Sequence, residues 1–417
     1  MLSARTREDA LQTLGEAARE HRATILASLI RILGDFDLAE DALQDAFEKA
    51  VAAWPVSGVP PAPAGWLHLT ARRAALDRLR RAQTGSRKLR EAALAAEIAR
   101  HEEGADMDEP VADDRLRLIF TCCHPALSRE ARVALTLRTL CGLTTSDIAR
   151  VFLIPEATMA QRIVRARRKI RDAGIPYEVP SADMLPERFA SVLAVIYLVF
   201  TAGYSANSED HLIRNDLCAE AIRLARLVAQ LMPDEPEALG ILALMLLQDS
   251  RRDARQAPDG RLVVLAEQDR ARWDPTEIRE GIRLLDTALA MRRAGPYQVQ
   301  AAIAAVHAEA LNADATDWRE IAMLYGRLAA MTPSPVVDLN RAVAISNVEG
   351  AAAALDLVEG VAGKLAGYQP FHAARADLLR RLGHDVEAAA AYRVAIELSS
   401  NDAERRFLQD RLAALTV

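Results

Sequence analysis

The chain has 417 residues, of which 51% are hydrophobic and 5% aromatic, and its net charge is −6. This length exceeds one ordinary domain, the apolar content excludes global disorder, and the negative charge argues against a protein that coats DNA over its whole surface. Alanine, leucine and arginine dominate, and alternating β-branched runs do not stand out. We therefore expect an all-α chain of roughly two to four domains.

Charge is distributed unevenly along the sequence. Residues 128–172 carry ten basic and four acidic side chains, whereas residues 173–417 carry a net charge of −9. One short basic module thus has acidic neighbours, which predicts a local surface that faces phosphates.

The four cysteines, Cys122, Cys123, Cys141 and Cys218, include no CxxC pair. So few cysteines in a long chain argue against a disulfide framework and suit a reducing cytoplasm. Cys122 and Cys123 are adjacent, and adjacent side chains on a helix diverge by about 100°, so they rarely bind the same metal ion. We therefore expect the cysteines to be small buried residues and not metal ligands. The N-terminus lacks a basic-then-apolar signal and no apolar run approaches ~18 residues, so neither export nor a membrane span is expected.

Residues 9–52 predict two helices, the second near Asp37–Ala53. This second helix has two faces with helical spacing. The apolar face consists of Leu43, Ala46, Phe47 and Ala50. The acidic ridge consists of Asp41, Gln44, Asp45 and Glu48. Such a ridge is either simply solvated or docks on a basic partner.

Residues 55–65 are rich in proline and glycine, so we expect a loop. A basic helix follows, in which Leu69, Ala75, Leu76 and Leu79 can be buried. Its exposed side is expected to carry Arg72, Arg73, Arg78, Arg80 and Arg81. This density of arginines favours contact with a phosphate backbone.

Residues 83–112 predict an acidic linker, and the helical pattern resumes at Asp114. Ser128 is a suitable N-cap with Ala131 at N3, and Thr144 or Thr145 caps a later helix. Residues 144–171 predict two helices joined by a tight turn and stopped by Gly174 and Pro176. The apolar stripe of the second helix is Met159, Ile163, Ala166 and Ile170. Its remaining surface is polar and cationic, which suits either a recognition helix in a DNA major groove or a solvated surface helix with a basic end.

The final segment matches the tetratricopeptide spacing, with Gly383 at a turn and Ala388, Tyr392 and Ala395 packing inside. The spacing of a second repeat helix and its terminating proline appears more weakly at two earlier places. These are Ala221, Ala225, Val228 and Pro233, and Ile321, Tyr325, Leu328 and Pro333. Small and aromatic residues at these offsets favour an α-solenoid, and the alternative is a generic helical bundle. No catalytic constellation is present, so an enzyme is not expected. Scattered residues could line a ligand cavity or could serve the core: Tyr204–Asn207, Arg214, Trp273, Tyr297, His307 and Trp318.

Three stretches in this order, DFDLAEDALQDAFEKA, GWLHLTARRAALDRLRR and TTSDIARVFLIPEATMAQRIVRARRKIR, resemble an extracytoplasmic-function (ECF) RNA polymerase sigma factor of the sigma-70 family. The resemblance covers about 175 N-terminal residues. It implies region 2 over 1–82, a flexible acidic linker over 83–112, and a region 4 helix-turn-helix over 113–174. A subgroup of these factors has a long C-terminal helical-repeat extension, which corresponds here to 187–417.

The resemblance also implies residue roles. Polymerase binding, to the β′ clamp helices, falls to Asp41, Gln44 and Asp45. Recognition of the −10 element falls to Arg72, Arg73, Arg78, Arg80 and Arg81, and the 55–65 loop lies where such factors hold a flipped-out base. Recognition of the −35 element falls to Thr158, Gln161, Arg162 and Arg165. Arg167, Arg168 and Lys169 are assigned to phosphates or to the polymerase β flap.

The chain departs from the usual family pattern at Arg73, Leu153, Ala157 and Gln161, which bears on promoter sequence rather than on fold. The leading hypothesis is a cytoplasmic, non-enzymatic initiation factor that binds core polymerase and promoter DNA. The hypothesis includes no cofactor and no membrane, and the C-terminal domain responds to a protein or small-molecule effector. The alternative is a stand-alone helix-turn-helix regulator with a ligand- or protein-sensing repeat domain.

Overall fold

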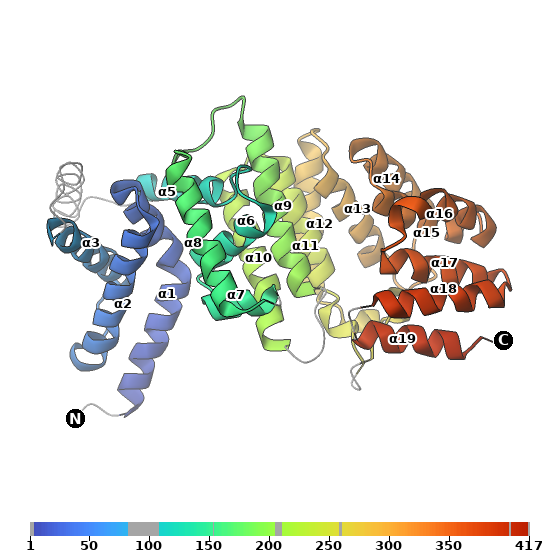
Figure 1. Cartoon of the computed structure of the whole chain (residues 1–417), viewed down its shortest axis with the longest axis horizontal. Coiled ribbons are helices and arrows are strands. Elements are labelled where there is room, and N and C mark those ends of the chain that lie inside the picture. The colour runs from blue at the N-terminus through green and yellow to red at the C-terminus, as the bar shows by residue number, and fades with distance from the viewer. Residues whose placement is uncertain are drawn as a thin grey trace. The chain divides into compact units, whose positions relative to one another are not determined.

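A computed structural model describes residues 4–81, 108–152, 154–204, 211–257, 261–399 and 402–415 (Figure 1). Within these residues the chain is helical, and its only β interaction is an isolated bridge between Gln256 and Leu262. The predicted all-α class is confirmed. The chain divides into two compact units, residues 1–199 and 200–417.

The first unit begins with a three-helix layer formed by α1 (Ala4–Leu33), α2 (Phe36–Ser57) and α3 (Pro63–Arg81), which pack on one another. The Asp35 carboxylate caps α2 by accepting from the amides of Asp37 and Leu38, which are otherwise without helical partners. The buried face of α2 keeps the helical period over its whole length, through Ala39, Ala42, Leu43, Ala46, Ala50 and Trp54. Phe47, expected to be buried, is only half-buried.

The expected loop over 55–65 is shorter in the structure than the sequence suggested. Helix α2 continues through Pro55 to Ser57, and α3 already begins at Pro63. Proline at 55 removes one hydrogen bond near the C-terminal end of α2, and proline is well suited to the first position of a helix. Gly58, with φ of 87°, ends α2 while its amide donates to the Trp54 carbonyl.

The predicted linker over 83–112 is wrong at its C-terminal end, because α5 (Asp108–Cys122) is already helical from residue 108. Aspartate and glutamate are favourable in the first turn of a helix, so an acidic composition did not require a loop. The rest of the linker prediction, residues 83–107, lies outside the described residues. Helix α5 packs against α1.

The helix-turn-helix follows α6 (Arg129–Thr139) and comprises α7 (Thr145–Val151) and α8 (Glu156–Asp172). Ser128 caps α6 by accepting from the Ala131 amide, as expected. Thr144 caps α7 in a reciprocal capping box with Asp147. The predicted apolar stripe of α8 is confirmed, since all four of its side chains are buried.

Helix α9 (Leu185–Tyr204) is long and apolar enough to cross a membrane by length and composition alone. The expectation that no segment has this character was therefore wrong. Half of its most apolar window is buried inside the protein, which is equally typical of a core helix. The division between the two units falls within it, after Val199.

The second unit is a succession of helices in which each packs on its neighbours along the chain. They are α10 (His211–Leu231), α11 (Pro236–Asp249), α12 (Pro275–Ala290), α13 (Pro296–Glu309), α14 (Trp318–Met331), α15 (Pro335–Val348), α16 (Ala351–Leu365), α17 (Gln369–Arg381), α18 (Asp385–Leu398) and α19 (Asp402–Ala413). Three short 3-10 turns lie between α11 and α12, at Arg252–Ala254, Leu265–Glu267 and Arg270–Arg272. This nearest-neighbour packing is the expected organisation of an α-solenoid.

The tetratricopeptide spacing predicted the turn between α17 and α18 correctly. Gly383 adopts φ of 77°, a left-handed conformation that glycine tolerates without steric cost. Ala388, Tyr392 and Ala395 are buried in one apolar cluster with residues of α17 and α19. Ala221, Ala225 and Val228 of α10 and Ile321 and Leu328 of α14 are also buried, in agreement with the weaker repeats.

Candidate nucleic-acid and polymerase interface

Helix α8 presents a polar face opposite its buried stripe. Thr158, Gln161 and Arg165 are exposed, and Arg162 is half-buried. These four side chains, together with Ser128 and Ala131 of α6, line a groove of about 300 Å³ between α8 and the start of α6. The helix-turn-helix thus presents all four predicted −35 residues on one surface.

Arg162 is held by an aromatic neighbour that the sequence did not single out. Its guanidinium lies 5.4 Å from the centre of the Phe152 ring, at the end of α7. A cation over an aromatic face is stabilised by about 0.5–1 kcal/mol at an exposed site. Phe152 therefore restricts the directions in which Arg162 can extend. Helical periodicity could not predict this contact, because Arg162 lies on α8 and Phe152 lies at the end of α7.

The arginines of α3 do not form one exposed cluster. Arg73 and Arg80 are exposed, whereas Arg72 is only 6% exposed and donates to the Ser28 hydroxyl. The expectation that Arg72 lies on the exposed side of α3 is therefore wrong, because a polar partner on α1 draws it into the interior. The side chain of Arg81 lies outside the described residues.

Arg78 connects the predicted −10 helix to the predicted polymerase ridge. Its guanidinium is 3.0 Å from a carboxylate oxygen of Asp41 and forms a two-point contact with Asp45 at 2.9 and 3.0 Å. The hydrogen bond to Asp45 raises the pKa of Arg78. Gln44 is exposed on the same ridge and donates to Glu48. The ridge is thus accessible, but two of its carboxylates already share a cation.

Arg167 also has intramolecular partners, Asp37 and Glu40 of α2, and only 11% of its side chain is exposed. Arg168 and Arg171 extend outward, at 72% and 62% exposure, and each pairs with Asp172. Lys169 is also exposed and lines the groove between α8 and the start of α6. Of the residues predicted to bind phosphates or the flap, Arg168 and Lys169 are thus accessible in this structure, and Arg167 is largely buried.

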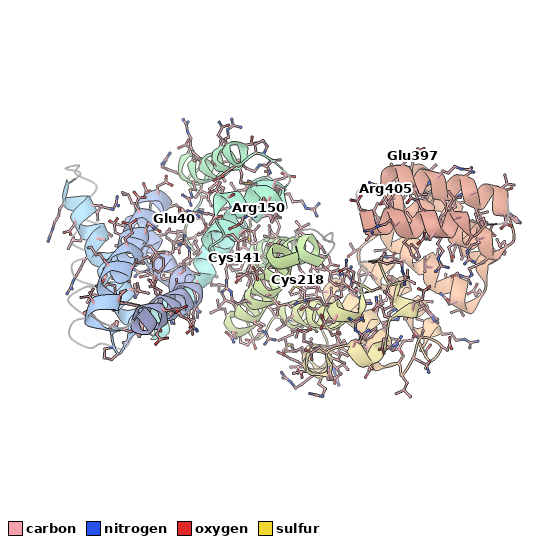
Figure 2. All side chains as sticks on the ribbon, turned by 90° about the horizontal axis from the view of Figure 1, so that it is seen from below. Glu40, Cys141, Arg150, Cys218, Glu397 and Arg405 are labelled. Atoms are coloured by element: carbon pink, nitrogen blue, oxygen red, sulfur yellow. The ribbon has the colours of Figure 1, made fainter. Side chains whose placement is uncertain are left out.

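The cysteines form no metal site in the described parts of the chain, where no group of three or more metal-ligating side chains occurs. Cys122, Cys123 and Cys218 are buried, and Cys141 is partly exposed. Cys141 and Cys218 are labelled in Figure 2. Burial raises the pKa of Cys123 to about 11 and that of Cys218 to about 12. These two thiols are therefore protonated at neutral pH and behave as small core residues.

The second unit contains a cavity of about 610 Å³, large enough for a small ligand. His307 and Trp318, two of the scattered residues, line it, with their rings 5.3 Å apart. Trp273 is buried instead, beneath the guanidiniums of Arg251 and Arg270. Three arginines face the cavity, and each has an intramolecular role. Arg270 donates to carbonyls at the end of α13, Arg381 donates to Ser346, and Arg411 pairs with Glu267.

Tyr204 contacts Arg251 and Arg255, and Tyr297 is half-buried at the start of α13. Residues 205–207 and the side chain of Arg214 lie outside the described residues. Those of the scattered residues that the structure describes therefore do not converge on one site.

Family comparisons agree with the two N-terminal modules. Residues 17–84 match sigma-70 region 2, and residues 117–170 match sigma-70 region 4. Residues 188–289 match a family of unknown function (DUF6596).

Relatives fall into two groups. An uncharacterized protein of Rhizobium meliloti is 44% identical over 398 residues, which cover 94% of each chain. The probable ECF RNA polymerase sigma factor SigI of Mycobacterium tuberculosis is 31% identical over 173 residues, which are 40% of this chain and 57% of that factor. The RNA polymerase sigma-H factor of Pseudomonas aeruginosa is 30% identical over 161 residues, which are 37% of this chain and 82% of that factor. The chain belongs to the sigma-70 family of RNA polymerase sigma factors, and its N-terminal part is similar to the extracytoplasmic-function type.

Proposed function

We propose that this protein is an ECF-type sigma factor, which directs core RNA polymerase to specific promoters in the cytoplasm, and that its C-terminal helical domain modulates this activity. The observation that carries the proposal is the pairing of two modules in one unit. One has an accessible acidic ridge on α2, and the other presents a polar helix-turn-helix face on α8. A factor that joins polymerase to DNA needs both surfaces, whereas an isolated DNA-binding regulator needs only the second.

In the proposed function, Asp41, Gln44 and Asp45 dock on the β′ clamp helices. Arg73 and Arg80 lie near the −10 element, while Arg78 stays on the ridge and Arg72 supports α3 from inside. The −35 element is read by Thr158, Gln161, Arg162 and Arg165. Arg168 and Lys169, with the exposed Arg171 on the same helix, neutralise phosphates or contact the β flap, and the solenoid domain receives a protein or small-molecule effector.

The direct test is in vitro transcription with purified core polymerase on promoter fragments from the host genome, with a well-behaved sigma factor as the positive control. Promoter-specific transcripts that require this protein are the expected result. An absence of such transcripts while the control factor works would overturn the proposal.

Capture of core polymerase without DNA separates the proposal from the stand-alone regulator. The charge reversal Asp41→Lys with Asp45→Lys should abolish capture, because it reverses two side chains of the ridge. It also breaks both contacts of Arg78, so Arg78→Gln is the matched control: it breaks the same contacts and leaves both carboxylates in place. Loss of capture in the charge-reversal variant but not in the control supports docking through the ridge. Wild-type protein that captures no polymerase supports the stand-alone regulator.

A further inference from the structure

The cavity of about 610 Å³ in the second unit is formed by segments that are far apart in the sequence. Leu265, Glu267 and Arg270 line it from the 3-10 turns between α11 and α12. Other lining side chains come from α15, α17 and α19. The guanidinium of Arg411 on α19 lies 2.9 Å from the Glu267 carboxylate, across 144 positions of sequence. A ligand bound in this cavity would therefore contact early and late segments of the solenoid at the same time.

Two of the three arginines that line the cavity have only uncharged hydrogen-bond partners. Arg381 donates to the hydroxyl and to the carbonyl of Ser346, at 2.9 Å each. Arg270 donates to two backbone carbonyls at the end of α13 and to the Thr316 hydroxyl. Among the described residues, no carboxylate pairs with either guanidinium. Burial lowers the pKa of Arg270 and the neighbouring Arg251 lowers it further, which is the direction expected for a cation without a counter-ion.

The carboxylates that line the cavity do not supply the missing counter-charge. Glu267 pairs with Arg411, and Asp377 lies 2.6 Å from Arg380, a residue outside the cavity lining. The third carboxylate, that of Asp314, is exposed. The cavity therefore has an excess of positive charge, and a bound anion would neutralise it.

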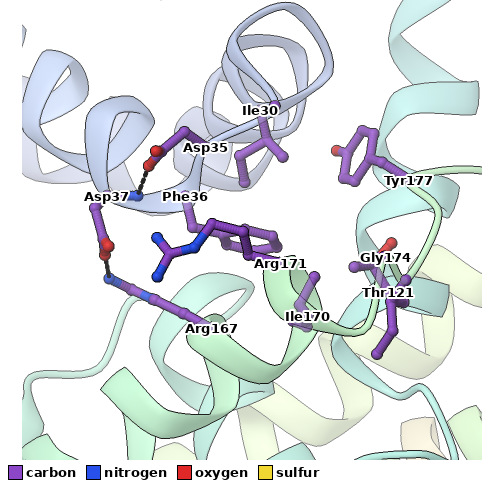
Figure 3. Close-up of a pocket in the computed structure, with 12 residues that line it drawn as sticks. Ile30, Asp35, Phe36, Asp37, Thr121, Arg167, Ile170, Arg171, Gly174 and Tyr177 are labelled. Carbon is purple, nitrogen blue, oxygen red and sulfur yellow. Dashed lines mark hydrogen bonds and ion pairs between the residues drawn. The ribbon is translucent and has the colours of Figure 1, made fainter.

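A smaller cavity of about 260 Å³ in the first unit provides the contrast (Figure 3). Arg167 lines it and pairs with Asp37 at 2.8 Å and with Glu40 at 2.7 Å. Figure 3 shows the contact between Asp37 and Arg167. Arg171, which also lines this cavity, lies 3.6 Å from Asp172. The guanidiniums there already have carboxylate partners, so that cavity needs no anion from outside the chain.

Much of the remaining wall of the larger cavity is apolar or aromatic. The rings of His307 and Trp318 lie 5.3 Å apart, and Phe407 lines the cavity with the buried Leu378 and Leu408. Burial and two nearby guanidiniums lower the pKa of His307 to about 4, so its ring is uncharged at neutral pH. This wall suits a ligand with an apolar or aromatic body.

We propose that this cavity binds a small organic anion, whose apolar body packs on the aromatic wall and whose carboxylate or phosphate pairs with Arg270 and Arg381. A guanidinium has more N–H donors than the contacts described above use, and its planar fork matches the oxygens of either group. The cavity volume lies within the range of about 300–1,000 Å³ that is typical of small-ligand sites. The role of this anion as the effector that modulates transcription rests on the proposed function.

The test uses the full-length protein and two fluorescent probes, anilinonaphthalene sulfonate and phenylnaphthylamine, which have the same apolar body and differ in charge. Wild type should bind the anionic probe more tightly than the uncharged one. Arg381→Gln should weaken binding of the anionic probe roughly tenfold, as expected for the loss of one hydrogen bond to a charged group. Its affinity for the uncharged probe should change little, and Arg381→Lys, which keeps the charge, should restore part of the lost affinity.

The matched control is Arg375→Gln on the same helix. Arg375 pairs with Glu359 at 2.6 Å and does not line the cavity, so this variant should bind both probes as wild type does. Equal affinity of wild type for the two probes would overturn the proposal. An Arg381→Gln protein with wild-type helicity and full affinity for the anionic probe would overturn it as well.

If Arg381→Gln fails to fold, Val343→Trp takes its place. Val343 lines the cavity and is 38% exposed, so a larger side chain can enter the cavity without disturbing the core. This variant should lose both probes, and unchanged binding would refute the cavity as their site. Competition with naphthylacetate and naphthyl phosphate separates a carboxylate ligand from a phosphate ligand, and displacement by neither compound would count against the proposal.

The effector role is tested with the better competitor in the in vitro transcription assay. At a saturating concentration, this compound should change promoter output with wild type but not with Arg381→Gln. Unchanged output with wild type would overturn the effector role and leave the binding site intact. If the protein gives no transcript with or without the compound, the proposed function fails, whereas the binding result stands.

Discussion

Replacement of Arg162 by alanine should change which −35 sequences the protein prefers, not only how tightly it binds DNA. An arginine that donates two hydrogen bonds to a guanine contributes about 1–3 kcal/mol of discrimination. At about 1.4 kcal/mol per tenfold change, this corresponds to roughly 5- to 150-fold in affinity. Arg162→Ala should therefore lower affinity by this factor for the preferred duplex. Duplexes substituted at the base pair that Arg162 contacts should bind almost as well to the variant as to wild type.

The structure adds a second, smaller effect through Phe152. Its ring lies 5.4 Å from the Arg162 guanidinium, an interaction of about 0.5–1 kcal/mol at a partly exposed site. Phe152→Leu should consequently weaken binding to the preferred duplex by roughly 2- to 5-fold. Duplexes substituted at the base pair that Arg162 contacts should be affected less, as in Arg162→Ala. A leucine keeps most of the apolar volume, so the fold of the helix-turn-helix should be retained.

The assay is fluorescence anisotropy of the reconstituted holoenzyme with a set of duplexes that carry every single-base change in the −35 element. Arg168→Ala is the matched control, because Arg168 lies on the same helix, is 72% exposed and pairs with Asp172, four residues along that helix. If Arg168 contacts a phosphate, its replacement should weaken binding to every duplex by a similar factor. It should also reduce the salt dependence of binding by about one counterion. If Arg162→Ala lowers affinity equally for every duplex, Arg162 is a phosphate ligand and the assignment is wrong.

Three further predictions concern stability. Thr144→Ala should lower the free energy of unfolding of region 4 by about 1 kcal/mol, measured by chemical denaturation, because Thr144 caps α7, while Thr145→Ala should change it little. The hydrogen bond from Thr144 lowers the pKa of Asp147. The ionised Asp147 therefore stabilises the fold above about pH 4, and this stabilisation is lost as the pH falls through the folded-state pKa. Asp147→Asn should consequently make the free energy of unfolding less dependent on pH in that acidic range. Burial and two nearby guanidiniums lower the pKa of His307 to about 4. The unfolded chain therefore binds more protons below about pH 6.5, and unfolding free energy should rise with pH between these values in wild type but less in His307→Gln.

Features set by one helix at a time were predictable from the sequence. The stripe from Met159 to Ile170 repeats with the period of an α-helix, and a buried face requires that period. The Ser128 cap follows from hydrogen bonds between residues three apart. Gly383 was predictable because few other residues adopt its backbone conformation at low cost.

Features that depend on a distant partner were not predictable in this way. Arg72 was expected on the surface with the other arginines of α3, but its partner, Ser28, is 44 residues away in the sequence. Glu40 is adjacent to the acidic ridge in sequence, yet its three arginines come from α1, α6 and α8. Spacing within a helix specifies which side chains share a face, and it carries no information about what that face meets.

The same reasoning applies to the start of the C-terminal extension. Two carbonyls at the end of α5, those of Phe120 and Cys123, accept hydrogen bonds from Arg188 at 2.9 Å and from Ser191 at 2.6 Å. The last carbonyls of a helix have no intrahelical partner, and burying them without one costs about 1–3 kcal/mol each. Arg188 and Ser191 belong to α9, within the range that matches the family of unknown function. The first residues of that family therefore complete the fold of region 4, so a truncation just beyond α8 would destabilise region 4 as well as remove the solenoid. Substitutions confined to the second unit are the sounder way to measure what the solenoid contributes.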